Sequence, residues 1–168
     1  MTSTRPYDLA IAGGGLAGGL IALALNKLRP ELRVALFEIE DHFGGNHIWS
    51  FFDSDIAPEH RWLVEPLISH HWNGYEVRFP KYQRSLSTGY NSIPSENLDR
   101  ILRERLPDES LRSGTTLDIG DGTRSASAII DARGGGDLSA LAFGWQKFVG
   151  QTLTLSQPHG LQHPVIMD

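Results

Sequence analysis

The sequence predicts an α/β fold in which a parallel sheet begins near the N-terminus. An apolar run, Tyr7 to Ala12, leads into a turn with five glycines in seven positions, and an Ala/Leu-rich helical pattern follows over Leu16 to Leu28. After a break at Pro30, a second apolar run extends from Arg33 to Glu38. This order of strand, turn, helix and strand within about 30 residues has the size of a βαβ unit. The right-handed crossover of such a unit makes the two strands parallel neighbours.

The middle of the chain predicts a mixture of short elements. An amphipathic helix is expected around Pro58 to Leu67, and the segment YEVRF at 75–79 has the composition of a strand. Residues 94–106 predict a clear helix, with Ser95 as its N-cap. Its apolar side chains recur at helical spacing and form one stripe: Leu98, Ile101, Leu102 and Leu106.

The last third of the chain predicts further strands. Residues 115–131 suggest a hairpin that turns at Asp121-Gly122, since Asp-Gly is a favoured hairpin turn. The second strand of this hairpin, Ala126 to Asp131, runs into another glycine cluster. Residues 148–168 alternate between apolar and polar side chains and predict one or two more strands.

Composition narrows the classes of function. The net charge of −5 argues against a surface that follows a nucleic-acid backbone. The chain has no cysteine, which excludes disulfides, thiolate metal sites and cysteine nucleophiles, and a cytoplasmic location is expected. No secretion signal is expected, because the start of the chain lacks a basic region followed by a long apolar stretch and a small-residue cleavage site. No membrane span is expected either, because no stretch reaches the ~18 apolar residues that cross a bilayer.

The glycine turn has the pattern of a dinucleotide-binding motif. Gly13, Gly15 and Gly18 have the spacing G-x-G-x-x-G between a predicted strand and a predicted helix. The first glycine permits the tight turn, the second lets a diphosphate approach the backbone, and the third lets helix and strand pack closely. Unpaired amides of the first helical turn, which includes Leu16 and Ala17, would hold the anion without a basic side chain.

Glu38 completes this motif, because it ends the second strand twenty residues after Gly18. A carboxylate at this place accepts a hydrogen bond from the ribose 2′-hydroxyl of a dinucleotide and repels a 2′-phosphate. The alternative is that the glycines serve close packing alone. The coincidence of turn, helix, second strand and acid favours the nucleotide.

Two later glycine clusters bear on the choice between a nicotinamide and a flavin nucleotide. Gly44 and Gly45 follow Glu38 closely, and the segment IIDARGGG at 129–136 ends a strand in glycines. Each cluster alone is typical of an ordinary turn. In this order after a nucleotide motif they favour FAD, with Asp131 and Gly134 at the later cluster.

Several segments together resemble the bacterial lycopene beta-cyclases, flavoproteins of carotenoid biosynthesis. The most discriminating are GGNHIWSF at 44–51 and HRWLVEPLISHHW at 60–72. The others are YDLAIAGGGLAGGLIAL at 7–23, YEVRFP at 75–80, IIDARG at 129–134 and SQPHGLQHPVIMD at 156–168. The resemblance extends over nearly the whole chain.

The resemblance implies a Rossmann-type FAD-binding domain, similar to that of glutathione reductase, over residues 1–57 and 92–140. The beginnings of a β-rich substrate region are expected over 58–91 and 141–168. The implied activity is an isomerisation: an enzyme keeps FAD reduced with NAD(P)H and closes the ends of lycopene, or a related carotenoid, into beta-ionone rings. Peripheral contact with the inner membrane is also implied.

His47 and Trp49 match the GGNHIWSF segment of the family and would lie near the flavin. A lone histidine and tryptophan in an aromatic stretch are, however, more often packing or capping residues.

The resemblance also predicts what this chain lacks. Family members are more than twice as long, and their proposed catalytic carboxylate corresponds to a segment beyond Asp168. The chain is therefore expected to be an N-terminal fragment with little or no turnover, and no catalytic residue is assigned within it. The stretch between Leu111 and Thr116 is also shorter than in typical members. Two alternatives stay open: a non-catalytic FAD-binding remnant, and a related FAD-dependent oxidoreductase.

The histidines do not predict a metal site. His70 and His71 are adjacent and would point to opposite faces of a strand. His159 and His163 are four residues apart, but the glycine and proline that follow them argue against the helix that would align them.

Aromatic side chains allow two interpretations. They either line an apolar tunnel for a carotenoid or fill an ordinary core, and the core is favoured for most of them. The residues concerned are Trp49, Trp62, Trp72, Trp145, Phe51, Phe52, Phe79 and Phe143.

Overall fold

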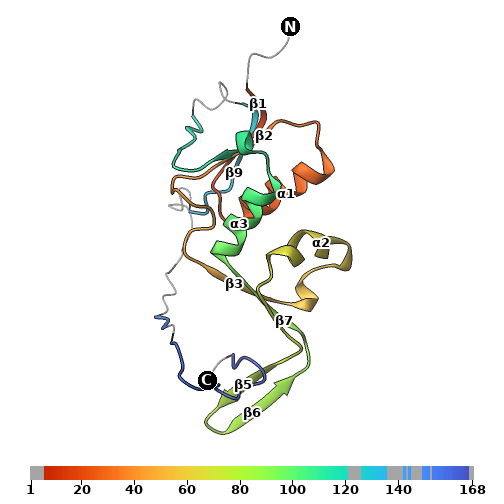
Figure 1. Cartoon of the computed structure of the whole chain (residues 1–168), viewed down its shortest axis with the longest axis vertical. Helices are drawn as coiled ribbons and strands as arrows, with labels where there is room; N and C mark the ends of the chain where they lie inside the picture. The colour runs from red at the N-terminus through yellow and green to blue at the C-terminus, as the bar shows by residue number, and fades with distance from the viewer. Residues whose placement is uncertain are drawn as a thin grey trace.

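The computed structural model describes residues 6–120, 126–135, 142, 144, 149–151 and 153–166. Figure 1 shows a parallel sheet with α1 (Leu16–Leu28) and α3 (Ser95–Arg105) packed together beside it. Antiparallel strands lead away from that sheet toward a hairpin (Figure 1). No helix within these residues is long and apolar enough to cross a membrane.

The parallel sheet has four strands in the order β8-β2-β1-β9. Its central strand, β1 (Tyr7–Ala12), pairs with β2 (Val34–Phe37) and with β9 (Ala126–Asp131), and the short β8 (Leu111–Arg112) pairs with the far side of β2. All four residues of β2 are buried, as expected of a parallel strand covered on both faces. The predicted βαβ unit is confirmed, since β1, α1 and β2 follow in order with parallel strands.

The predicted hairpin at Asp121-Gly122 is wrong in its pairing. β9 lies parallel to β1, and residues 115–120 form no strand. The physical reason is that this segment is held to the end of β2, where the Thr115 amide donates to the Glu38 carbonyl oxygen over 2.8 Å. Leu117 is then buried against the sheet. The predicted turn itself lies outside the described residues.

The two long helices bury the faces that their sequences predict. α3 buries Leu98, Ile101 and Leu102, and the stripe continues to the buried Leu106 just after the helix. Gly19 of α1 lies where α3 crosses, and a Cβ there would come within 3.0 Å of Leu98 Cδ1. These side chains and the inner side of the sheet form the main core.

Ser95 is not the N-cap of α3, contrary to the prediction. Pro94 occupies that position in an extended conformation, and Ser95 is the first helical residue and is buried. Its amide donates to the His47 carbonyl oxygen over 2.9 Å, and its hydroxyl accepts from the His47 amide over 3.4 Å. A long-range partner therefore takes the place of the local cap.

The remaining strands are antiparallel. A three-stranded sheet has the order β3-β7-β4, with β3 (Ile48–Phe52), β7 (Tyr90–Pro94) and β4 (His70–Trp72). β5 (Tyr75–Phe79) and β6 (Tyr82–Leu86) form a separate hairpin, which confirms the strand predicted at 75–79.

The helix predicted around Pro58 to Leu67 is present only in pieces. A 3-10 turn (Pro58–His60), α2 (Arg61–Val64) and a second 3-10 turn (Glu65–Leu67) follow one another. Pro66 has no amide hydrogen to donate back along a helix, so a continuous helix cannot form across it.

The strands predicted for 148–168 are not found in its described part, residues 149–151 and 153–166. One isolated bridge joins Val165 to Glu76 on β5. Prolines at 158 and 164 remove amide donors that a longer ladder would need. Phe143 and Trp145 lie outside the described residues.

Candidate functional site

The glycine turn between β1 and α1 depends on close backbone approaches. Gly13 has a φ of +103°, and a Cβ there would lie 2.7 Å from the carbonyl carbon of Ala132. A Cβ at Gly18 would collide with the Gly13 carbonyl oxygen. The fold itself therefore requires glycine at both positions.

Gly15 differs from these two glycines, because no described residue crowds a Cβ at its position. It is the N-cap of α1 with a φ of −70°, and a Cβ there would meet no atom within 4 Å. No side chain caps the helix, and the described residues supply no hydrogen-bond acceptor to the amides of Leu16 and Ala17. Open space in front of unpaired amides at the positive end of a helix suits an anion.

Glu38 is held in place by backbone amides at the end of β2. Its Oε2 accepts from the Gly14 amide over 2.8 Å, and its Oε1 accepts from the Glu40 amide over 3.1 Å. These bonds fix the carboxylate beside the turn, while each oxygen keeps acceptor capacity for a further donor. The half-buried side chain can thus accept a hydrogen bond from a ligand hydroxyl.

Both later glycine clusters contact the same turn. The Gly44 amide donates to the Gly14 carbonyl oxygen over 2.9 Å, and the Ala132 amide donates to the Ala12 carbonyl oxygen over 2.7 Å. All of these segments meet at the carboxyl edge of the parallel sheet, where open α/β sheets bind ligands. The segments that meet there carry the predicted site residues Gly13, Gly15, Leu16, Ala17, Gly18, Glu38, Gly44, Gly45, Asp131 and Gly134.

A cavity of about 230 Å³ opens beside Glu38. Phe37, Ile39 and Leu117 give it apolar walls, and Arg133 lies at the glycine turn. Thr115 and Thr116 also line it, and sequence reasoning missed them. They follow β8, so the rule that parallel strands carry site residues at their carboxyl ends would have found them if this two-residue strand had been recognised.

Asp131 and Arg133 form an exposed ion pair at this edge, with Arg133 Nε 2.8 Å from Asp131 Oδ1. The hydrogen bond from the guanidinium lowers the pKa of Asp131 to about 2, so its carboxylate is charged at neutral pH. The pair therefore brings little net charge to the mouth of the cavity.

His47 and Trp49 are placed differently from each other. The His47 side chain is exposed and stacks on the Trp49 ring with a centroid distance of 5.6 Å. Trp49 packs against the main core. The packing interpretation therefore describes Trp49, and only the His47 ring faces solvent beside the glycine doublet.

A second hollow, of about 380 Å³, is lined in part by Gly45. Glu96 and Asp99 line it, and Asp99 Oδ1 accepts from the Phe43 amide over 2.9 Å. Arg103, 2.9 Å from Asp99 Oδ2, keeps the pKa of Asp99 low although partial burial acts to raise it. Its lining has two carboxylates against one histidine, His42, so the diphosphate fits the Gly15 side better.

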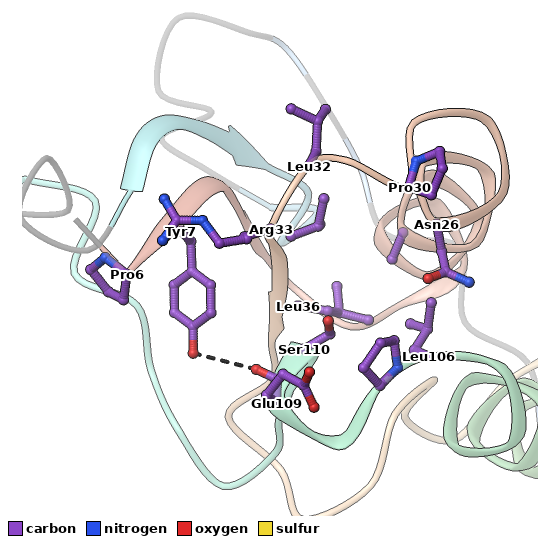
Figure 2. A pocket seen from close by; sticks show the side chains of 13 residues that line it. Pro6, Tyr7, Asn26, Pro30, Leu32, Arg33, Leu36, Leu106, Glu109 and Ser110 are labelled. Atoms are coloured by element: carbon purple, nitrogen blue, oxygen red, sulfur yellow. Dashed lines mark hydrogen bonds between the residues drawn. The ribbon is translucent and has the colours of Figure 1, made fainter. Parts of the chain in front are cut away.

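An apolar cavity of about 390 Å³ lies at the opposite, amino edge of the sheet (Figure 2). Three of its polar side chains are already engaged: the Tyr7 hydroxyl donates to the Glu109 carbonyl oxygen, Asn26 donates to the Arg105 carbonyl oxygen, and Arg33 pairs with an aspartate. None of its lining residues is a glycine or lies in the first turn of α1 or α3, so the cavity does not suit a diphosphate.

The described residues contain no group of three or more histidine, aspartate or glutamate side chains that could hold a metal ion. His70 bonds to Ser69 and His71 to Asn91, from the two faces of β4.

The parallel sheet is flanked by helices and carries a glycine turn and an acidic side chain at its carboxyl edge. This arrangement is consistent with a partial Rossmann-like domain of nucleotide-binding proteins. The sequence model of the family described as "Lycopene cyclase protein" matches residues 8–168. The chain belongs to this family.

Three relatives, each named lycopene beta-cyclase, align over 96% of this chain and 44% of their own length. The protein of Pantoea ananas is 42% identical over 176 residues, that of Pseudescherichia vulneris 43% over 171, and that of Paracoccus sp. (strain N81106 / MBIC 01143) 40% over 172. The chain thus spans less than half the length of the curated relatives it matches.

Proposed function

We propose that this chain supplies the cofactor-holding part of a lycopene beta-cyclase, with FAD bound across the carboxyl edge of the parallel sheet. The observation that carries the proposal is the meeting of four sequence segments at that edge, around a glycine whose missing side chain leaves only empty space. Identity of 40–43% to lycopene beta-cyclases supports the substrate class.

The residues present fit the nucleotide. The amides of Leu16 and Ala17 would bind its diphosphate in front of Gly15, and the fixed carboxylate of Glu38 would accept from the ribose hydroxyls. The cavity beside Glu38, walled by Phe37 and Leu117, offers the adjoining apolar surface for the adenine. When bound in reduced form, with NAD(P)H as the reductant, FAD supplies the electrostatic stabilisation for ring closure.

The role of this chain is then binding and positioning. The turn holds the diphosphate through backbone groups alone, so the ligand needs no neutralising lysine or arginine. The proton donor for ring closure is not assigned to this chain. Lycopene is a hydrocarbon, so we also propose peripheral contact with the inner membrane from the cytoplasmic side, where the protein would take up its substrate.

The test is expression of the complete reading frame in a bacterium that accumulates lycopene, followed by chromatography of its carotenoids. Products with beta-ionone rings are expected from the unchanged protein, and a marked loss of them from Gly15→Val. Lycopene that stays acyclic in the presence of folded, unchanged protein would refute the proposed activity.

A further inference from the structure

The antiparallel sheet has two different faces. Trp49, Phe51 and Ile93 point inward and pack against the main core. Because side chains alternate along a strand, the residues between them point outward. The Ser50 and Ser92 hydroxyls, 2.9 Å apart on neighbouring strands, lie on this outward face.

Four aromatic rings gather on the outward face. The ring of Tyr90 is central, with centroid distances of 5.3 Å to Phe52, 6.2 Å to Trp72 and 6.2 Å to Tyr75. His70 extends the row by stacking on Trp72 at 5.7 Å. All four residues are half-buried, so part of each stays accessible. We refer to Phe52, Trp72, Tyr75 and Tyr90 as the aromatic face.

The aromatic face is unusual for an outward surface. The solvated side of an antiparallel sheet ordinarily carries polar side chains, and a contiguous apolar patch marks an interaction site. By their registers, the outward positions of β3, β7 and β4 carry no acidic, lysine or arginine side chain. The nearby Asp53 carboxylate bonds to Asn91, whose side chain points to the buried side of the sheet. An uncharged partner therefore suits the face.

The face is also continuous with the candidate cofactor site. Ile48 lies on the same side of β3 as Phe52 and is 74% exposed. It directly follows His47, whose backbone is bonded to Ser95 beside the glycine doublet. A ligand that extends along β3 from Phe52 past Ile48 would thus approach the carboxyl edge of the parallel sheet.

We infer that the aromatic face binds a linear, uncharged polyene and directs one end of it toward the cofactor edge. The inference deepens the proposed function and rests on it for the choice of an acyclic carotenoid. Flat aromatic rings bury large areas and stack on conjugated systems, which matches a polyene better than a saturated chain. Trp72 and Tyr90 are the residues that would set this specificity.

The experiment uses the full chain and vesicles of phosphatidylcholine loaded with lycopene. Lycopene is achiral, so visible circular dichroism arises when it binds in a chiral protein site. Trp72→Ser is expected to weaken binding about tenfold, since it removes a stacking ring. Trp72→Phe keeps a ring and is expected to retain most of the affinity.

Trp62→Ser is the matched control, because Trp62 is also half-buried but lies on α2 under the Lys27 ammonium, 4.0 Å from its ring centroid. Far-ultraviolet circular dichroism verifies that each variant is folded. Equal loss in Trp62→Ser, or full binding by Trp72→Ser, would overturn the inference. So would a dimer that Trp72→Ser dissociates in sedimentation, because a second copy would then occupy the face.

The experiments distinguish a failure of the aromatic-face inference from a failure of the proposed function. Lycopene binding that depends on Trp72, without ring formation by the complete protein, would support the face and refute the activity. Ring formation with lycopene binding unaffected by Trp72→Ser would refute the face alone.

Discussion

Glu38 is the residue on which nucleotide recognition depends most. We expect Glu38→Gln to weaken FAD binding about tenfold or more, because a hydrogen bond to a charged acceptor contributes roughly 1.5–3 kcal/mol. Fluorescence titration with FAD measures this. Glu40→Gln is the control, since Glu40 is exposed and contributes only its backbone to the site. If both variants bind FAD like the unchanged chain, the role given to Glu38 is wrong.

Asp99 links the loop before the glycine doublet to α3. Its carboxylate accepts from the Phe43 amide and from Arg103, so Asp99→Asn should lower the free energy of unfolding by about 1–2 kcal/mol in urea titrations at pH 7.

The pH dependence of this contribution follows from the lowered pKa of Asp99. A carboxyl whose pKa is lower in the folded state stabilises fully above its ordinary value of 3.8, and this stabilisation is lost as the pH falls through the folded-state pKa. The difference between the unchanged chain and Asp99→Asn should therefore shrink below about pH 4. A difference that grows on acidification contradicts this assignment.

At the scale of elements, α3 joins the parallel sheet and the antiparallel sheet β3-β7-β4 in one core. Leu98 is fully buried against Gly19 of α1, so Leu98→Ala should cost about 2–5 kcal/mol of unfolding free energy. Arg100→Ala, on the solvent side of the same helix, should cost under about 0.5 kcal/mol, since its ion pair with Glu104 is exposed. Similar losses in both variants would show that α3 does not pack as described.

The elements also show which parts of a fold sequence reasoning can predict. β1, α1, β2 and the stripe of α3 were predictable because local periodicity and glycine spacing encode them. The partner of β9 was not, because strand pairing depends on contacts between residues far apart in sequence. The same reason explains Ser95, whose bonding partner is 48 residues away.

Across the whole molecule, local stability should be uneven. Ala10, Ile11, Ala35 and Leu36 in the parallel sheet are fully buried. Four of the five residues of β6 are exposed, and among the described strands β6 pairs with β5 alone. Amides of β6 should exchange with deuterium at least about 100-fold faster than those of β1, as measured by mass spectrometry. Equal exchange rates in β6 and β1 would contradict a core centred on the parallel sheet.

The segments of the candidate site could be recognised from the sequence, and their binding roles stay a prediction. The site's glycines, Glu38 and Asp131 stand in recognisable motifs, and the structure brings these motifs together. Thr115 and Thr116 were not predicted, because their position depends on β8, and a two-residue strand is too short to be recognised from its sequence.

The most direct test of the central claim is FAD binding by Gly15→Val. A Cβ at Gly15 meets no described atom within 4 Å and the backbone is extended, so the variant should fold, with a slightly lower melting temperature because valine is a poorer N-cap than glycine. Gly150→Val, at another position where a Cβ meets nothing within 4 Å, is the control. The account predicts that only Gly15→Val loses FAD in a fluorescence titration. Unchanged FAD affinity in folded Gly15→Val would contradict it.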